Sequence, residues 1–570
     1  MMIDLTLGDL LRKIKPKFLD SKFVELYKKL FTEKHNELTD IEKSFLLKNA
    51  AIFLNQIDRN IKKFGYSIIL RYSNVFNNYI PLYDVSVNLG FIPIAKFIET
   101  RDDFKESFSN ILMNACMEQS KNVDAENVKF LTSQQTKLKE FVGTDNNFTI
   151  VAPTSYGKSE LVIDHMTSNC RNKKICIIVP TKALLAQTKN RILRDLIKKE
   201  TNIKIITHPD MYINDDEFIG ILTQERLLTL LTNNANFKLD EIIVDEAHNL
   251  LDNSTRSVLL AQVILLTNKR NPDTKIKYLS PFVTDINSLN IRFFNKNWQF
   301  NKISEFLKIE KYFIYSDNVL KAYDPFLNTI LSEKECTGSV YDFIYENQSH
   351  KNIIYSNRPK DVESISKALK EKEACVDDIE NSRAYLAIKD YLDADYNLLD
   401  CMKHGIVYHH GAMPDNIKLY VEHVYKKNNS IKHIITTSTL LEGVNIPADK
   451  IFLMDIKKGR SYLTHSNFMN LTGRVCRFKE IFNHESGSLK LLEPEIFLLK
   501  NEFMDRRANL ENYIKDITRV IKENVDEVNN PLLVNSSDEK NKLDSHIEFI
   551  ENIEKDTINT ANLNIAYANS

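Results

Sequence analysis

The sequence lacks any apolar run long enough to cross a bilayer, and it lacks paired cysteines. No stretch approaches the roughly 18 consecutive apolar residues that a membrane-spanning helix needs. There are 7 cysteines, none of them in a C-x-x-C pair, which argues against a disulfide framework or a zinc finger. The N-terminus carries Asp4 and no small-residue cleavage site, so we do not expect a signal peptide. These absences predict a globular protein of the cytoplasm that binds no membrane.

The sequence also lacks an excess of charge of either sign. It has 76 basic and 77 acidic residues, for a net charge of −1. A small DNA-binding domain would be strongly basic, so a nucleic-acid groove would have to be a local patch on a neutral body. A chain of 570 residues is too long for one core, and we expect three or four domains.

The pattern of apolar residues along the chain changes near Asp124. Before it, apolar residues recur at helical spacing, as in Phe23, Leu26 and Leu30, which predicts an all-α region. After it, short β-branched runs alternate with amphipathic helices, the pattern of βαβ units and parallel sheets. The runs form two sets, at 148–152, 174–180, 203–208, 241–246 and 275–280, and then at 352–356, 404–410, 432–438 and 450–455.

These patterns predict an α/β fold with two tandem parallel-sheet domains. We place an all-α accessory domain at 1–125, the two α/β domains at 126–325 and 326–485, and a helical C-terminal extension with a polar tail at 486–570. The boundary between the α/β domains is expected near 320–345.

A phosphate-binding loop is the most specific local signal. APTSYGKS (152–159) directly follows the predicted strand FTIV, where backbone amides and a helix N-terminus can face phosphates. We expect Lys158 to reach the β- and γ-phosphates of ATP and Ser159 to hold Mg²⁺. The cradle itself comprises Thr154, Ser155, Tyr156 and Gly157. Ala152 stands where the usual motif begins with glycine, so the pattern taken alone is imperfect.

An acidic pair ends a later strand, in IIVDEAH (242–248). Asp245 is placed to bind the Mg²⁺ shell, Glu246 to act as general base on the attacking water, and His248 to couple this site to the neighbouring domain. Two adjacent carboxylates could instead form a solvated turn, but the upstream phosphate loop favours the catalytic interpretation.

Together these motifs resemble the superfamily-2 DEAD/DEAH-box helicases, over residues 130–480. The resemblance implies two RecA-like domains, with Gln134 of LTSQQTKL (131–138) on the adenine. VPTKALLAQ (179–187) and LTQERL (222–227) resemble motifs Ia and Ib, which implies strand contacts at Pro180, Thr181 and Thr223. LSPF (279–282) stands where relatives have S-A-T and departs from that pattern at its last two residues.

The second α/β domain completes the resemblance. TSTLLEGVNIPA (437–448) is similar to motif V of the branch with archaeal repair and RNA-exosome helicases, which implies roles for Gly443 and Asn445 at the nucleotide and for Thr437 at the strand. VYHHGAMP (407–414) belongs to the same pattern. For His410 a phosphate-backbone or interdomain contact is favoured over zinc, since no third ligand stands at metal spacing.

FMNLTGRVCRF (468–478) resembles motif VI, with Asn470 and Cys476 replacing the usual Gln and second Gly. Arg474 and Arg477 are three residues apart, and we expect them on one helix face, from which they can stabilise the γ-phosphate in the transition state. Cys476 is expected to be a buried, inert thiol.

Two functions fit this set. One is an ATP-driven helicase or translocase on single-stranded DNA or RNA; the other is a nucleic-acid-sensing ATPase switch that controls a partner, plausibly a nuclease. The stretch at 70–99, with the HH-G segment, resembles bacterial antiphage-defence helicases of the Hachiman type. Since no ring-closing domains are recognisable after Arg477, we also expect weak processivity, a stable protein partner docked on the helical N-terminal or C-terminal region, or a naturally longer chain.

Overall fold

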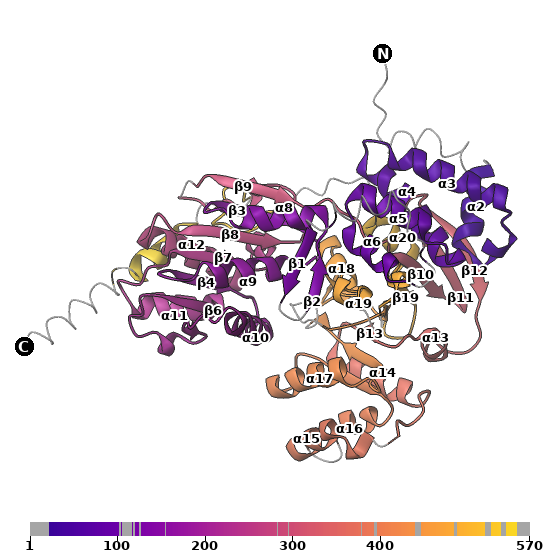
Figure 1. Cartoon of the computed structure of the whole chain (residues 1–570). Helices are drawn as coiled ribbons and strands as arrows, with labels where there is room; N and C mark the ends of the chain where they lie inside the picture. The colour runs from indigo at the N-terminus through magenta and orange to yellow at the C-terminus, as the bar shows by residue number, and fades with distance from the viewer. Residues whose placement is uncertain are drawn as a thin grey trace, which may run out of the picture. The chain divides into compact units, whose positions relative to one another are not determined.

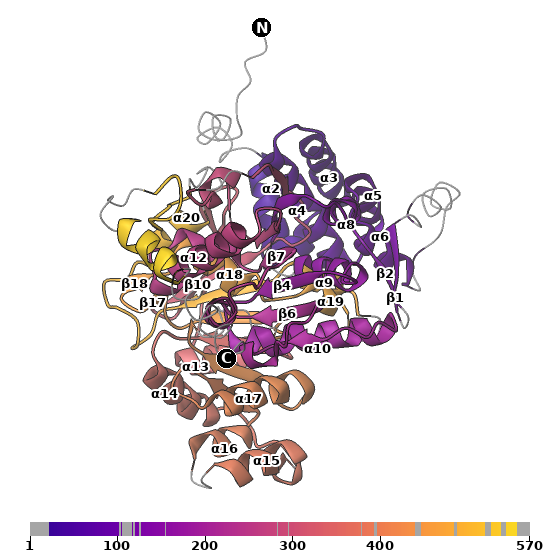
Figure 2. The same cartoon turned by 90° about the vertical axis from the view of Figure 1, so that its left-hand side faces the viewer.

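The computed structural model describes two compact units. It covers residues 22–553 and 555, except 102–103, 105–116, 118–119, 125–126, 154–155, 282, 294–295, 378, 393–395, 439–445, 484–486, 519–525 and 537–542. The P-loop unit comprises the described parts of 134–304 and of 523–570, and the arginine unit those of 1–133 and 305–522. Figures 1 and 2 show the elements of each unit from two sides.

The P-loop unit is built on a parallel sheet. Its seven strands run in the order β5-β6-β4-β7-β8-β3-β9, and every neighbouring pair is parallel. The strands are β3 (Asn147–Val151), β4 (Lys174–Ile178), β5 (Ile205–Ile206), β6 (Phe218–Leu222), β7 (Glu241–Val244), β8 (Lys275–Ser280) and β9 (Trp298–Lys302). Helix α8 (Ser133–Val142) precedes the first of these strands, and the helices between the strands are α9 (Lys158–Ser168), α10 (Lys182–Lys198), α11 (Gln224–Asn233) and α12 (Thr255–Arg270).

The sequence gives a direct reason for these strands. β3, β4, β7 and β8 are runs rich in β-branched or aromatic residues with at least four consecutive buried positions, as expected for a sheet covered on both faces. All four were predicted. β6 and β9 were not predicted; β6 is fully buried, whereas β9 is a half-exposed, polar edge strand.

The arginine unit contains a mixed sheet rather than a purely parallel one. Its order is β12-β11-β10-β19-β16-β13-β15-β14, with antiparallel pairing only where β10, β11 and β12 meet. The strands are β10 (Lys311–Ser316), β11 (Val319–Asp324), β12 (Thr329–Glu335), β13 (Asn352–Tyr355), β14 (Ile406–His409), β15 (His433–Thr436), β16 (Lys450–Leu453) and β19 (Glu495–Leu499). Three helices of this unit contribute to the sites described below: α18 (His465–Thr472), α19 (Phe478–Ile481) and α20 (Leu510–Ile517).

The predicted helical N-terminal region is confirmed, but it does not form a unit of its own. The helices α2 (Lys22–Phe31), α3 (Asp40–Leu54), α4 (Arg59–Phe76), α5 (Ile80–Leu89) and α6 (Ile92–Glu99) lie together in Figure 1. A short hairpin, β1 (Lys121–Asp124) and β2 (Asn127–Phe130), follows them. Buried polar contacts bind the helices to the mixed sheet region: Tyr27 Oη donates to Asp324 Oδ2 at 2.6 Å, and Asn74 Nδ2 donates to Glu493 Oε2 at 2.8 Å.

Two predicted boundaries differ from the structure. The mixed sheet already begins with β10 at Lys311, before the expected boundary at 325/326, and it ends with β19, beyond the expected end at 485. The region 486–570 is therefore not a separate helical extension with a solvated tail. Its later part returns to the P-loop unit, where Leu532 and Leu533 are fully buried. Sequence order misled the prediction because β19 and this segment pair with residues far away in the chain.

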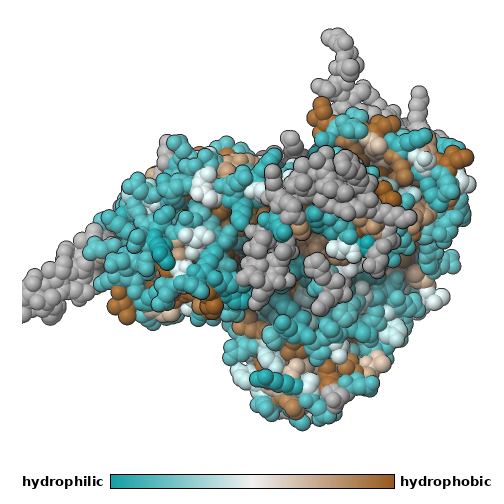
Figure 3. Space-filling view, in the orientation of Figure 1, coloured by the Kyte–Doolittle hydropathy of each residue, from teal (hydrophilic) through white to brown (hydrophobic). Residues whose placement is uncertain are grey.

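The visible surface is of ordinary character. On the face shown in Figure 3, hydrophilic residues predominate and hydrophobic ones are scattered singly or in small groups. Within the part of the chain that the structure describes, no helix is both long and apolar enough to cross a membrane.

Candidate ATP and nucleic-acid site

The phosphate loop joins β3 to α9 as the sequence predicts. Gly157 caps α9 with φ of 89°, a left-handed conformation that favours glycine over other residues. Lys158 is the first residue of α9, and its Nζ donates to the carbonyl oxygens of Ala152 and, at 3.3 Å, of Pro153. Burial lowers the pKa of Lys158, while the charges of Glu246 and Asp245 oppose that shift. The ammonium therefore lies in the field of both carboxylates.

The acidic pair ends β7. Asp245 is buried, with 9% of its surface exposed, and its backbone N–H donates to Ile178 O at 3.0 Å. Burial first, and then the neighbouring charge of Glu246, raise the pKa of Asp245 to about 7. Glu246 has φ of 54° and caps the 3-10 helix η4 (Ala247–Leu251), and its Oε2 lies 3.4 Å from His248 Nδ1. Two adjacent carboxylates, one of them buried, favour a bound cation.

The donor set fits Mg²⁺. A divalent ion prefers carboxylate and hydroxyl oxygens, and such oxygens are available at Asp245 and at Ser159 in the first turn of α9. Burial and then the charge of Glu246 raise the pKa of Asp245, and the charge of Lys158 opposes this shift only in part. A bound cation would oppose it further.

Parallel pairing sets the order of these groups along one edge of the sheet. The strands β3, β8, β7, β4 and β6 are successive neighbours, and in a parallel sheet all their carboxyl ends lie on the same edge. The phosphate loop, Ser280, the Asp245–Glu246 pair, Pro180–Thr181 and Thr223 therefore follow one another along it. Ala152 N donates to Ser280 O at 3.1 Å, which joins the first two directly.

The structure shows that two adjacent glutamines have different hydrogen-bond partners, which the sequence alone does not reveal. Gln135, with 9% exposed, donates through Nε2 to Tyr156 O at 2.7 Å, inside the phosphate loop. Gln134, the predicted adenine contact, instead pairs with Ser304: its Oε1 accepts from Ser304 N at 3.0 Å and its Nε2 donates to Ser304 Oγ at 3.1 Å. Gln135 thus contacts the phosphate loop, and the adenine contact of Gln134 stays a prediction.

The predicted strand contacts of the P-loop unit come together. Thr181 caps α10 by accepting from Leu184 N at 3.2 Å, and Thr223 caps α11 at the neighbouring strand end. Arg256, which the sequence analysis missed, ties the two turns: its Nη2 donates to Pro180 O at 2.7 Å and its Nε to Glu225 Oε1 at 2.8 Å.

In the arginine unit, Arg474 and Arg477 lie between α18 and α19. Arg474 is buried, and its Nη2 donates to Asn470 Oδ1 at 3.2 Å. Arg477 caps α19, where its N–H donates to Glu480 Oε2 at 3.2 Å. Burial raises the pKa of Glu480 to about 7, although the N–H bond and charge of Arg477 oppose the shift. Lys308, not predicted, supports the turn by donating to Val475 O at 2.8 Å.

The expectation that both arginines share one helix face is wrong. α18 ends at Thr472, and Cys476 has φ of 52°, a left-handed conformation that no α-helix continues through. Cys476 is buried, as predicted, and burial raises the pKa of its thiol well above the ordinary value. The position requires the conformation for which the motif ordinarily uses glycine.

The remaining predicted residues of the arginine unit are enclosed. Thr437 and His410 follow the adjacent strands β15 and β14, and Thr437 N donates to His409 O at 3.4 Å. Only 4% of Thr437 and 3% of His410 is exposed, and His410 Nε2 lies 3.2 Å from Glu363 Oε1. Gly443 and Asn445, as well as Thr154 and Ser155 of the phosphate loop, lie outside the described residues.

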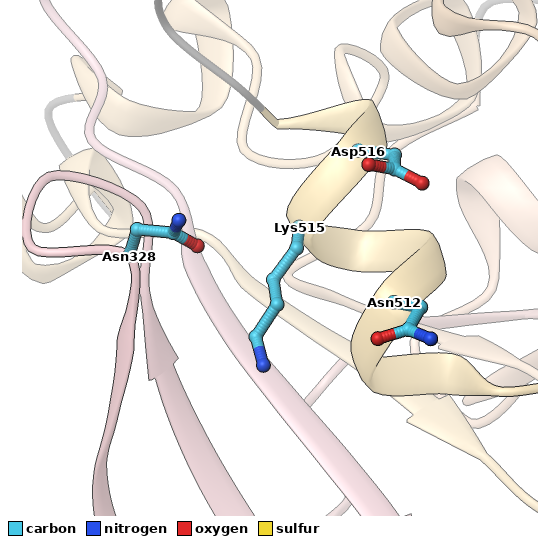
Figure 4. A pocket seen from close by; sticks show the side chains of 4 residues that line it. All are labelled: Asn328, Asn512, Lys515 and Asp516. Carbon is cyan, nitrogen blue, oxygen red and sulfur yellow. The ribbon is translucent and has the colours of Figure 1, made fainter. Parts of the chain in front are cut away.

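A cavity of about 320 Å³ lies elsewhere in the arginine unit. Figure 4 shows the residues that line it, Asn328 on the β11–β12 turn and Asn512, Lys515 and Asp516 on α20. None of the predicted site residues lines it.

A phosphate loop followed by a helix N-terminus, with an acidic pair on the same edge of a parallel sheet, is the arrangement with which P-loop NTPases bind nucleotide phosphates. Residues 132–280 match the DEAD/DEAH box helicase family, so this segment is a DEAD/DEAH box helicase domain.

Relatives of known name extend the comparison. "Anti-bacteriophage protein B" of Escherichia coli (strain K12) is 24% identical over 356 residues, covering 60% of this chain and 45% of that protein. "ATP-dependent DNA helicase Hel308" of Methanococcus vannielii is 25% identical over 360 residues, covering 58% and 46%. A crystal structure of the DUF1998 helicase MrfA bound to DNA and AMPPNP has 15% identity and a TM-score of 0.48, covering 68% of this chain and 50% of MrfA. The chain thus spans about half the length of the relatives it matches.

Proposed function

We propose that this protein is an ATP-dependent helicase or translocase that moves along single-stranded nucleic acid, and that it hydrolyses ATP at the phosphate loop and acidic pair of the P-loop unit. One observation carries the proposal: the edge of the P-loop sheet holds the phosphate loop, the acidic pair and the two capped threonine turns in succession. The match of residues 132–280 to the DEAD/DEAH box helicases supports it.

Each residue of the ATP site has a distinct role in this proposal. Lys158 binds the β- and γ-phosphates, and Glu246 accepts a proton from the attacking water. Ser159 and Asp245 would hold Mg²⁺, which supplies charge neutralisation at the phosphates. Arg474 and Arg477 stabilise the negative charge that develops during transfer, and His248, paired with Glu246, relays the state of the site.

The nucleic acid is held by its backbone. Pro180, Thr181 and Thr223 stand at helix N-termini, where peptide N–H groups favour phosphates. Thr437 and His410, being almost fully enclosed, are proposed to shape the strand path of the second domain rather than to form its surface. Binding through phosphates predicts low sequence specificity and strong salt dependence. The name of Hel308 favours DNA as the first substrate to test.

The relative named anti-bacteriophage protein B supports a role in antiphage defence. A second candidate function belongs to the same setting: the ATPase cycle would act as a nucleic-acid-sensing switch for a separate protein, plausibly a nuclease, with little unwinding. Duplex unwinding measured beside affinity purification from the native cell separates the two.

The first experiment measures ATP binding and strand displacement with three variants. Lys158→Ala is expected to weaken ATP binding and remove unwinding, whereas Glu246→Gln is expected to bind ATP normally without turnover, because it loses the base and no phosphate contact. Lys238→Ala is the matched control, since Lys238 is exposed and precedes β7 at the opposite edge of the sheet. Wild-type activity in the first two variants would contradict these roles.

A further inference from the structure

The chain comes back to the P-loop unit after it has built the arginine unit. We name residues 526–534 the C-terminal strap. Leu532 and Leu533 are fully buried in the core of the P-loop unit, and Leu533 pairs with Ile291 in an isolated antiparallel bridge. Arg292 N donates to Leu532 O at 2.8 Å. The strap is therefore an integral part of this unit, although more than 200 residues separate it from the rest in sequence.

The strap binds the C-terminal end of η4. The N-terminal end of this helix follows directly after the acidic pair Asp245–Glu246. Asn529 N donates to Leu251 O at 2.8 Å. Asn530 is fully buried, and its Nδ2 donates to Leu250 O at 2.9 Å and to Ser257 O at 3.1 Å. Carbonyl groups at a helix end have no partner within the helix, so these bonds complete η4 where it would otherwise fray.

The strap also holds the loop that follows β8. The Asp526 carboxylate accepts from Thr284 N, at 3.1 Å to Oδ1 and 3.0 Å to Oδ2, and from Asp285 N at 3.1 Å. Bonds from backbone N–H groups to a carboxylate are stronger than neutral ones. β7 and β8 are neighbours, so one short segment fixes the loops after both strands.

The conformation of Glu246, at the N-terminal end of η4, explains why the C-terminal end of this helix must be held in place. Glu246 caps η4 with φ of 54°, a backbone conformation that L-residues rarely adopt and that persists only where the surrounding structure holds it. The Oε2 atom of Glu246 is buried without a hydrogen-bond partner and lies 3.4 Å from His248 Nδ1, so few contacts of its own fix this side chain. The position of the general base thus depends on the rigidity of η4.

We propose that Asp526 and Asn530 are positioning residues for ATP hydrolysis: the strap immobilises the loops after β7 and β8 and so keeps Glu246 aimed for proton transfer. This rests on the proposed ATPase function. Lys158 bonds to the carbonyl oxygens of Ala152 and Pro153 within the phosphate loop itself, so we expect ATP binding to persist when the bonds of the strap are removed.

The test compares steady-state ATP hydrolysis of Asp526→Ala, Asp526→Asn and Asn530→Ala with Glu548→Ala. Glu548 is an exposed acid of the same C-terminal region, so its removal changes charge without changing a contact of the strap. We expect kcat to fall roughly three- to thirtyfold in Asp526→Ala and Asn530→Ala, with KM for ATP unchanged. Asp526→Asn keeps one acceptor oxygen and should recover part of kcat. Equal kcat in all folded variants, or a loss that appears only in KM, would overturn the proposal.

Hydrogen exchange decides the same question without ATP. In Asp526→Ala and Asn530→Ala the amides of 247–251 and 283–292 should exchange faster, whereas those of α9 should keep their wild-type protection. Unchanged protection at 247–251 would refute the positioning role even if the wild type hydrolysed no ATP, an outcome that would refute the proposed function separately. Uniformly faster exchange across the whole unit would show that the strap only stabilises the fold, and would equally overturn the proposal.

Discussion

Replacing each of the adjacent glutamines by alanine should give opposite results. Gln135 is nearly buried and donates to the Tyr156 carbonyl at 2.7 Å, so Gln135→Ala leaves a polar group of the phosphate loop without its partner. Such a loss costs about 1–3 kcal/mol, and the part of it that weakens ATP binding can lower the affinity at most roughly 150-fold. Gln134→Ala removes two bonds to Ser304 instead, and should lower the unfolding temperature while ATP affinity stays near that of the wild type.

The assay is an equilibrium titration with fluorescent ATP and GTP analogues, alongside thermal unfolding of each variant. If Gln135 also contacts the adenine, Gln135→Ala should lose the preference for ATP over GTP; if it only orders the loop, both nucleotides should weaken equally. The reasoning is refuted if Gln134→Ala loses ATP affinity while Gln135→Ala binds like the wild type.

Three further predictions concern stability. Cys476→Ala should be less stable than Cys476→Gly by about 1 kcal/mol, although glycine is the larger truncation. The reason is that only glycine adopts the φ of 52° without strain. Urea unfolding of both variants gives their free energies of unfolding, and equal values would contradict the prediction. Tyr27→Phe should lower the free energy of unfolding by about 1–3 kcal/mol, because Asp324 loses a buried hydrogen-bond donor. An unfolding free energy equal to that of the wild type, measured by calorimetry, would contradict this prediction. Burial raises the pKa of Asp324 from 3.8 to about 6. The contribution of this group to the free energy of unfolding is therefore fully present below about pH 4 and is lost as pH rises through 6. Asp324→Asn should remove this pH dependence, and an unchanged pH profile in that variant would contradict the prediction.

The parts of the fold that were predictable are those whose signal is local. β3, β7 and β15 are short apolar runs between turn residues, and the phosphate loop and acidic pair follow such runs directly. Position in the chain therefore placed Lys158 and Glu246 correctly on the same edge, because parallel strands share their carboxyl ends.

The parts that were missed depend on partners far away in sequence. β19 enters the mixed sheet between β10 and β16, and the strap enters the core of a unit that the chain had left long before. The polar, acidic character of residues 534–556 predicted a polar tail, and the buried Leu532 and Leu533 just before it are only two residues. Likewise, nothing local distinguishes Gln134 from Gln135: the helix α8 turns one toward Ser304 and the other toward the phosphate loop.

The central claim is tested most directly by Mg²⁺-dependent ATP turnover, measured with no nucleic acid, with single-stranded DNA and with single-stranded RNA. The account predicts hydrolysis that at least one of the two strands stimulates several-fold, that falls with increasing salt, and that Glu246→Gln abolishes without loss of ATP binding. A folded wild-type protein that hydrolyses no ATP with either strand would contradict it.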